Sequence, residues 1–378
     1  MHLTAVTIRR FRNIEALEWQ PAPGLNLIWG ENGQGKTNLL EAIHVALTGR
    51  SFRTHRDEDF LPWNAASDPA DPTLAQVVIE RRGAPRRLRA IMAKGCKRAF
   101  VDDRWLPRLA DLWGEAIVVT FIPEEAGLLK GPPAPRRRFL DIVLSQISRP
   151  YLEHLQHYNQ ALRQLNAAYK LASERQAREH ARAYYPALAR AGASLIAARA
   201  RRLREAAQPM SERYGALGGS GDLSLRYHHD PRLTGLDPAD PGLDARQVED
   251  QFLARLEAGF EEGRRLGLCA QGPHRDDFEV TLNDTDLRRF GSQGQHRLAA
   301  LTLKLESACW IEMALGEPPV LLLDDFGSEL DPGRREAVLG GLRQAMQVLI
   351  TATHPGDLGP AELFAQSRQI ALGRLLAP

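Results

Sequence analysis

The sequence predicts an α/β fold whose sheet core is split into two parts by an inserted helical domain. A glycine-rich loop, GENGQGKT at 30–37, follows a short apolar run. A second apolar run that ends in two aspartates, VLLLDD at 320–325, comes nearly three hundred residues later. Between the two, apolar residues recur every three or four positions over 140–169, as in a helix that buries one face.

The first element is a strand, loop and helix over residues 24–49. Gly30, Gly35, Lys36 and Thr37 meet the pattern G-x-x-x-x-G-K-[ST]. The glycines let backbone N–H groups face one anion, and the N-terminus of the following helix adds positive charge. Lys36 is expected to reach the β- and γ-phosphates of a nucleotide, and Thr37 to ligate Mg²⁺. Gly49 marks the expected end of the helix.

Composition is that of a soluble globular protein, with 43% hydrophobic and 25% charged residues in 378. The chain is long enough for two domains or for one domain with a large insertion. No apolar run approaches the roughly 20 residues of a membrane span, and the N-terminus lacks a signal-peptide core. Three scattered cysteines, Cys96, Cys269 and Cys309, have no metal-ligand spacing. We therefore expect a cytoplasmic protein with reduced thiols.

Net charge is only +2, so the charge of the whole chain does not demand a nucleic-acid partner. Basic runs occur at 81–89, 136–138 and 199–204. Each alone is more typical of a solvated face, but together they make a DNA-facing surface plausible. The candidate DNA contacts are the arginines of the first run, on a predicted hairpin: Arg81, Arg82, Arg86, Arg87 and Arg89.

The order of elements predicts a head formed by residues 1–125 and 265–378, with a mostly helical domain inserted at 126–264. Short β-type runs fill the first part, including a hairpin that turns at 83–85 and a buried strand at 117–122. Two helices of some 25–30 residues follow, an arm on the order of 40 Å long. Pro150 is expected to interrupt or kink the first of them, giving two segments or one bent helix, and Pro186 lies inside the second. A last amphipathic helix spaces Val248, Phe252, Leu256 and Phe260 by four.

The apolar run at 320–325 predicts the second half of a nucleotide site, with Asp324 holding Mg²⁺ through water. Just before it, Ser292-Gln293-Gly294-Gln295 opens a helix and offers a hydroxyl and free N–H groups to an anion. The glycine-rich loop already serves the chain's own nucleotide. This second cradle is therefore expected to take the γ-phosphate held by another copy. His354 closes the strand VLITAT and is expected to donate a hydrogen bond to that phosphate.

This order of motifs resembles the heads of ABC-type ATPases, including the SMC proteins. Outside the nucleotide motifs, FIPEEAGLLKGPPAPRRRFLD, QALRQLNAAYK, GPHRDDFEVTLND, FGSQGQHR and LLLDDFGSELD resemble the RecF family of bacterial DNA repair proteins, along nearly the whole chain. The resemblance implies an ABC-type, SMC-like P-loop ATPase head that is split in sequence, with an inserted α-helical domain.

The resemblance also implies site roles, with ATP and Mg²⁺ as cofactors. The resemblance gives catalytic roles to Lys36, Asp325 and His354. It gives metal binding to Thr37 and Asp324. Asp325 stands where transporters have a glutamate base. It is one methylene shorter, so slow hydrolysis is expected. The signature reads GSQGQ instead of LSGGQ. No glutamine follows 117–122 at a Q-loop position, where Glu124 or Glu125 are alternatives. The nucleotide-binding set is Gly30, Glu31, Asn32, Gly33, Gln34, Gly35, Lys36, Thr37, Ser292, Gln293, Gly294, Gln295 and, in the D-loop, Asp331.

The function that the resemblance implies is ATP-dependent DNA binding in recombinational repair. Family members dimerise on ATP, favour duplex DNA next to single-stranded gaps, and act with RecO and RecR to load RecA. Two alternatives stay open: the nucleotide-binding subunit of a membrane transporter, and a scaffold that holds ATP without turnover. The helical insertion and the segment GPHRDD at 272–277 argue against the transporter.

Overall fold

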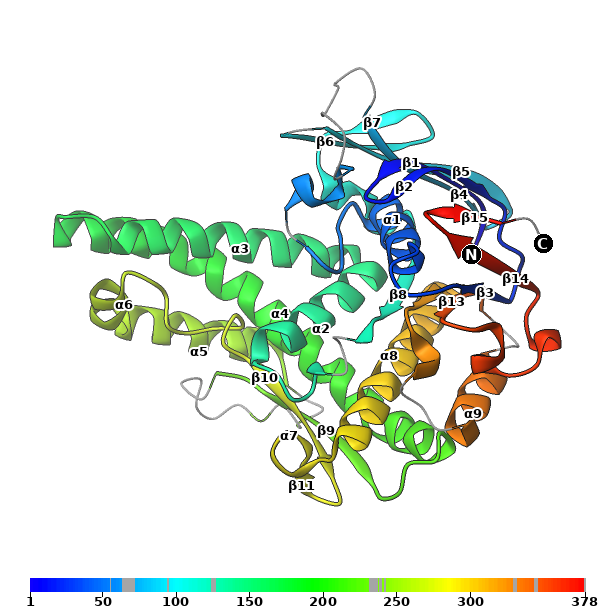
Figure 1. Cartoon of the computed structure of the whole chain (residues 1–378). Helices are drawn as coiled ribbons and strands as arrows, with labels where there is room; N and C mark the ends of the chain where they lie inside the picture. The colour runs from blue at the N-terminus through cyan, green and yellow to red at the C-terminus, as the bar shows by residue number, and fades with distance from the viewer. Residues whose placement is uncertain are drawn as a thin grey trace. The chain divides into compact units, whose positions relative to one another are not determined.

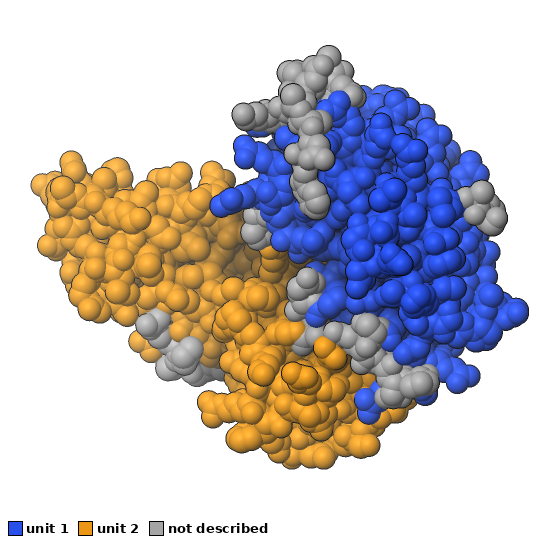
Figure 2. Space-filling model, in the orientation of Figure 1, with its two compact units in different colours: residues 1–125, 307–378 blue, residues 126–306 orange. Residues whose placement is uncertain are grey.

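The computed structural model describes residues 1–54, 56–62, 72–93, 95–123, 127–230, 237, 240, 243–328, 332–342 and 346–376, with the backbone alone at 110, 328 and 332. The chain forms two compact units (Figure 2): unit 1 comprises residues 1–125 and 307–378, and unit 2 residues 126–306. The second boundary lies later than the expected residue 265. The reason is that the strand at 277–282 pairs with the strand at 223–228, which keeps 265–306 with unit 2.

Unit 1 contains two six-stranded sheets (Figure 1). The first is antiparallel, in the order β2-β1-β4-β5-β6-β7. Its strands are β1 (His2–Phe11), β2 (Ile14–Trp19), β4 (Thr73–Arg81), β5 (Ala84–Ala93), β6 (Cys96–Val101) and β7 (Arg104–Leu106). The predicted hairpin is present, but its turn lies at Arg82–Gly83, both at positive φ, and not at 83–85, because Pro85 already pairs with Glu80 within the strands.

The second sheet has the order β15-β14-β3-β13-β12-β8 and is parallel apart from β15. Its strands are β3 (Leu25–Trp29), β8 (Val118–Phe121), β12 (Val320–Leu323), β13 (Val348–Ala352), β14 (Gln366–Ala371) and β15 (Arg374–Leu375). Strands from both ends of the chain are therefore neighbours in one sheet.

Helix α1 (Lys36–Thr48) lies between the two sheets, and one hydrophobic core joins all three (Figure 1). Leu39, Leu40 and Ile43 are fully buried, and Gly49 ends the helix at φ 72°, as expected. The remaining helices of unit 1 are short: η1 (Asp57–Phe60), η2 (Leu109–Leu112), η4 (Phe326–Ser328), α9 (Pro332–Leu342), η5 (Pro355–Leu358) and η6 (Ala361–Leu363). Helix α8 (Gln293–Leu315) begins in unit 2 and ends in unit 1.

Unit 2 is mostly helical. It contains α2 (Pro133–Ile147), α3 (Arg149–Tyr169), α4 (Glu174–Ala216), α5 (Ala245–Ala258), α6 (Phe260–Leu266), α7 (Leu287–Phe290) and the small sheet of β9 (Leu223–His228), β10 (Asp277–Leu282) and β11 (Thr285–Asp286). Val248, Phe252, Leu256 and Phe260 are all buried, as their spacing predicted.

The prolines of the two long helices have different effects. The predicted interruption near Pro150 is confirmed: α2 ends at Ile147, and the Ser148 side chain caps α3 by accepting from the Tyr151 N–H. Pro150 then lies in the first turn of α3, where a missing N–H leaves no bond unmade. Helix α4 instead runs for 43 residues through Pro186 and Pro209, and α3 has 21, so neither has the expected 25–30.

A buried ionic network holds unit 2 together. The Arg199 side chain on α4 donates to Asp141 on α2 at 2.7 Å and to the Tyr151 hydroxyl on α3 at 3.0 Å. It also donates to the Pro273 carbonyl at 2.8 Å and lies 3.6 Å from the Asp276 carboxylate. The RecF-like segment GPHRDD therefore positions the helices of unit 2.

Two arginines of the basic runs are consequently not available to DNA. Arg199 is 2% exposed, and Arg136, at 1%, forms a two-pronged ion pair with Asp277 at 2.7 and 2.8 Å. Sequence reasoning placed both runs on a surface because charged side chains are rarely buried without partners. Their partners are distant in the sequence. None of the helices in the described part of the chain is long and apolar enough to cross a membrane.

Replacing Arg199 with alanine should destabilise unit 2, because Asp141 and Asp276 lose the cation that balances them. We expect a loss of about 3–5 kcal/mol in the free energy of unfolding, measured by chemical denaturation. The exposed neighbour Arg201, changed to alanine, is the control. This change should shift the free energy of unfolding by less than about 0.5 kcal/mol. Equal effects of the two changes would contradict the network's role.

Candidate nucleotide-binding site

The phosphate-binding loop connects β3 to α1, and its glycines are required by geometry. Gly33 and Gly35 have φ angles of 80° and 111°, which residues with side chains rarely adopt. A Cβ on Gly30 would lie 2.4 Å from the Ile370 carbonyl oxygen, and one on Gly35 would lie 3.0 Å from the Asn13 side chain. The loop thus leads directly into the N-terminus of α1, whose first N–H groups have no partner within the helix.

Lys36 folds back over the loop. Its Nζ donates to the carbonyls of Gly30 at 2.5 Å and Glu31 at 3.0 Å, and the residue is only 7% exposed. Burial lowers the pKa of Lys36, and the nearby carboxylates of Asp325 and Asp324 act in the opposite direction. The lysine therefore lies buried at the loop, close to two acidic groups.

Asp324 connects three segments that are far apart in the sequence. Thr37 Oγ1, at the start of α1, donates to Asp324 Oδ2 at 2.7 Å, and Thr351 Oγ1, in β13, donates to Asp324 Oδ1 at 2.7 Å. The two residues expected to hold Mg²⁺, Thr37 and Asp324, are thus in direct contact. Hydroxyl and carboxylate oxygens are ligands that Mg²⁺ prefers, so this pair fits the metal.

Thr351 was missed by the sequence reasoning. Besides donating to Asp324, its hydroxyl accepts from the Asp325 N–H at 2.8 Å, so one side chain orients both aspartates. Asp325 has a φ of 47°, a left-handed conformation that aspartate tolerates better than most residues. The polar threonine inside the apolar run VLITA was the one signal that could have indicated this role.

His354 follows β13, at the carboxyl end of the sheet, where the parallel strand β12 also ends. The side chain is exposed, and its backbone N–H donates to the Asp357 carboxylate at 2.8 Å, which fixes the turn. Its contact with a γ-phosphate stays a prediction. Glu124, Glu125 and Asp331, expected at the Q-loop and D-loop, lie outside the described residues.

Two turns from opposite ends of the chain support the loop from outside. The Asn13 side chain, between β1 and β2, donates to the Gly33 carbonyl at 3.3 Å and accepts from Asn38 at 2.7 Å. Between β14 and β15, the N–H groups of Leu372 and Gly373 donate to the side chain and carbonyl of Gln34 at 2.7 and 2.9 Å. Sequence motifs do not reveal such contacts.

The second anion cradle lies at the start of α8, in unit 2. Ser292 Oγ accepts from the Gln295 N–H at 3.2 Å, and Gln295 Oε1 accepts from the Ser292 N–H at 2.8 Å, a capping box. Ser292, Gln293 and Gly294 are exposed, and a Cβ on Gly294 would meet no atom within 4 Å. The N–H groups of Ser292 and Gln295, which were expected to be free for an anion, are therefore already hydrogen-bonded within the turn, and open space lies beside Gly294.

The five candidate DNA arginines differ in their surroundings. Arg81 is held by Glu317 at 2.8 Å. Arg86 pairs with Asp102 at 2.8 Å, while Arg87 and Arg89 share Asp103 at 3.2 and 3.1 Å. Arg82, 3.4 Å from Glu317, has a side chain that is 71% exposed. Their contact with DNA stays a prediction.

Comparison with known proteins identifies the family. A family model described as an AAA domain matches residues 5–80. The DNA replication and repair protein RecF of Symbiobacterium thermophilum is 38% identical, over 97% of this chain and 96% of that one. The chain belongs to the RecF family. RecF of Geobacter sulfurreducens is 36% identical over 95% and 94% of the two chains.

Solved structures agree with the RecF assignment. A structure of the recombination mediator protein RecF-ATP in the RecFOR pathway has a TM-score of 0.87 and 27% identity, covering 100% of this chain and 98% of that one. An SMC head bound to the C-terminal winged-helix domain of ScpA has a TM-score of 0.55 at 13% identity, over 98% and 94% of the two chains, a likeness of fold alone. The ABC-type, SMC-like fold class predicted from the sequence is confirmed.

Replacing Lys36 with alanine should weaken ATP binding by roughly 10- to 150-fold, because one charge-assisted contact to phosphate and the bonds that close the loop are lost. Titration calorimetry measures the dissociation constant. The exposed Lys170, changed to alanine, is the matched control and should bind as the parent does. Parent-like affinity of the Lys36 variant would show that the loop does not hold the phosphates.

Proposed function

We propose that this chain is an ATP-dependent DNA-binding protein of recombinational repair, in which bound ATP joins two copies of the chain. The observation that carries the proposal is the contact between Thr37 and Asp324, at 2.7 Å across 287 residues of sequence. A phosphate-binding loop in contact with an aspartate at the end of another strand of the same parallel sheet is the arrangement that P-loop ATPases use. Membership of the RecF family supports the role in repair.

The chain's own residues supply the first half of the ATP site. The loop N–H groups and Lys36 bind the phosphates, and Thr37 with Asp324 would hold Mg²⁺ in place of their present hydrogen bond. Bound between these two residues, Mg²⁺ would neutralise charge that develops on the phosphate oxygens. Thr351 keeps the Asp324 carboxylate oriented.

The second half of the site is proposed to come from another copy. The chain's own loop holds its own nucleotide, whereas the Ser292 cradle is exposed and rigid. Contacts from this cradle to a γ-phosphate would be lost when ATP becomes ADP. Since a ligand shifts an equilibrium only through its differential affinity for the two states, ATP should favour the dimer and ADP should not.

Hydrolysis is proposed to release the dimer, with Asp325 as general base. A water oxygen attacks the γ-phosphorus, the bond to the β–γ bridging oxygen breaks, and the water's proton passes to the Asp325 carboxylate. ADP and phosphate leave. The backbone of Asp325 is held by Thr351, so the residue depends on a fixed turn for its position. Turnover is expected to be slow because aspartate reaches less far than glutamate.

The partners proposed are DNA, RecO and RecR. The solved RecF structures are described as belonging to the RecFOR pathway. For this chain we propose binding of duplex DNA next to single-stranded gaps, in the ATP-bound dimer, to promote RecA loading. The basic hairpin of β4 and β5 is the proposed duplex contact, through phosphates.

Asp325→Asn should keep ATP affinity and lower the hydrolysis rate by at least about 100-fold, because a positioned base of this kind contributes that much. Phosphate release and calorimetry measure the two quantities. The variant's dimer on DNA should also last longer than the parent's. An unchanged hydrolysis rate would reject Asp325 as the base.

Sedimentation with ATP, with ADP and without nucleotide tests the dimer. We expect a dimer with ATP alone. Ser292→Arg should bind ATP and stay monomeric, because the larger side chain fills the space in front of the cradle. Ser220→Arg, at another exposed serine of unit 2, is the control and should dimerise. A parent protein that remains monomeric in saturating ATP would remove the mechanism.

A further inference from the structure

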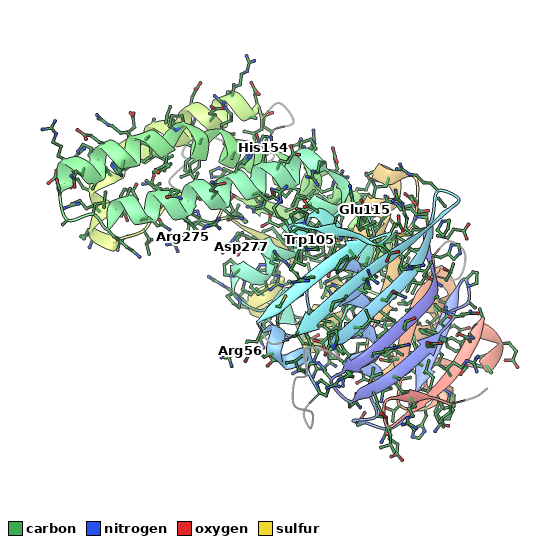
Figure 3. The ribbon with its side chains drawn as sticks, turned by 90° about the horizontal axis from the view of Figure 1, so that it is seen from above. Arg56, Trp105, Glu115, His154, Arg275 and Asp277 are labelled. Carbon is green, nitrogen blue, oxygen red and sulfur yellow. The ribbon has the colours of Figure 1, made fainter. Side chains whose placement is uncertain are left out.

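One face of the antiparallel sheet in unit 1 points away from the core. On β5, the buried residues Leu88, Ala90 and Met92 face α1, and on β6 Ala99 and Val101 do so. Successive side chains of a strand point to opposite faces, so the residues between them lie on the outer face. Figure 3 looks down on this sheet, with Trp105 of β7 labelled. The outward residues of β5, β6 and β7 include Arg87, Arg89, Ile91, Arg98, Phe100 and Trp105.

The strand register places three of these residues in one row. Arg89 is opposite Phe100, and Phe100 is opposite Trp105. The Arg89 guanidinium lies over the Phe100 ring, 4.6 Å from its centroid. Trp105 is 56% exposed, an unusual exposure for the largest apolar side chain. Adjacent strands are about 4.8 Å apart, so the side chains of Phe100 and Trp105 leave the same face of the sheet as cross-strand neighbours.

Positive charge is concentrated in the same strands. Residues 84–106 contain seven lysines and arginines and two aspartates, whereas the whole chain has a net charge of only +2. Arg87 and Arg89 share the single carboxylate of Asp103. Arg98 is exposed and has no ion-pair partner among the described residues.

We propose that this aromatic–arginine face binds single-stranded DNA. A base stacks on the exposed ring of Trp105, and Arg98 contacts the phosphate beside it, while Phe100 lies under the Arg89 guanidinium. An exposed ring beside arginines on the face of a sheet suits unpaired bases, because every base has a face to stack whereas a duplex hides those faces. This proposal depends on the proposed function in one respect only, namely that the chain binds DNA. It supplies a way to recognise the single-stranded side of a gap.

The test is fluorescence anisotropy of labelled oligodeoxythymidine and of a duplex of equal length, with the full chain and no nucleotide. Trp105→Ala should weaken single-strand binding by at least about fivefold, because base–aromatic stacking contributes that much. Duplex binding should stay within about twofold of the parent, since phosphate contacts are unchanged. Trp105→Phe should retain most of the affinity because a ring remains.

Arg98→Gln separates the charge from the stacking. It should weaken single-strand binding. The slope of log affinity against log salt concentration should fall by about the amount that one phosphate contact contributes. Arg108→Gln, at an arginine outside the face, is the control and should do neither. The proposal is overturned if Trp105→Ala binds single strands like the parent. It is also overturned if Trp105→Ala and Trp105→Phe lose the same affinity for single strands, or if Trp105→Ala loses as much affinity for the duplex as for single strands.

This outcome is distinguishable from failure of the proposed function. If the parent does not dimerise with ATP but binds oligodeoxythymidine through Trp105, the ATP-joined dimer is rejected and the single-strand-binding face is retained. A parent that dimerises on ATP and binds duplex, with Trp105→Ala unaffected on single strands, would do the reverse.

Discussion

The carboxylate of Asp324 is the contact on which the rest of unit 1 depends. It accepts one hydrogen bond from Thr37 and another from Thr351, and so joins the start of α1, the end of β12 and the end of β13. These segments can meet only because β3, β13 and β12 are neighbours in one parallel sheet. A chain whose phosphate loop and aspartate are separated by an entire helical unit must therefore complete its sheet from both ends before the site exists.

Much of this arrangement was readable from the sequence, because it follows local rules. The loop at 30–37 and the break before Pro150 follow from the conformational limits of glycine and proline, as does a hairpin turn at Gly83, although it lies one residue earlier than expected. What could not be read depends on contacts between distant segments. Thr351 and Asn13 are ordinary polar residues until the fold brings them to the site. Arg199 looked like part of a basic surface until Asp141 and Asp276 surrounded it.

The two anion cradles differ in a way that bears on mechanism. The loop of unit 1 is enclosed by its own turns, with Lys36 buried against it. The Ser292 cradle is exposed and is held by its own capping box and by the His296 N–H, which donates to the Ser292 carbonyl. A rigid but incomplete donor set suits a site that is completed on association, since little ordering is then needed at the moment of contact. With aspartate as the proposed base, hydrolysis is expected to be slow, so the bound ATP would mainly hold two copies together until it is hydrolysed.

The central claim is that each ATP site uses the loop of one copy and the Ser292 cradle of another. Mixing Lys36→Ala with Ser292→Arg tests this most directly, by the rate of ATP hydrolysis. Each variant alone should be inactive. In a mixed dimer, the intact loop of the serine variant meets the intact cradle of the lysine variant, so one working site forms and hydrolysis should return. A mixture as inactive as its two components would contradict the claim.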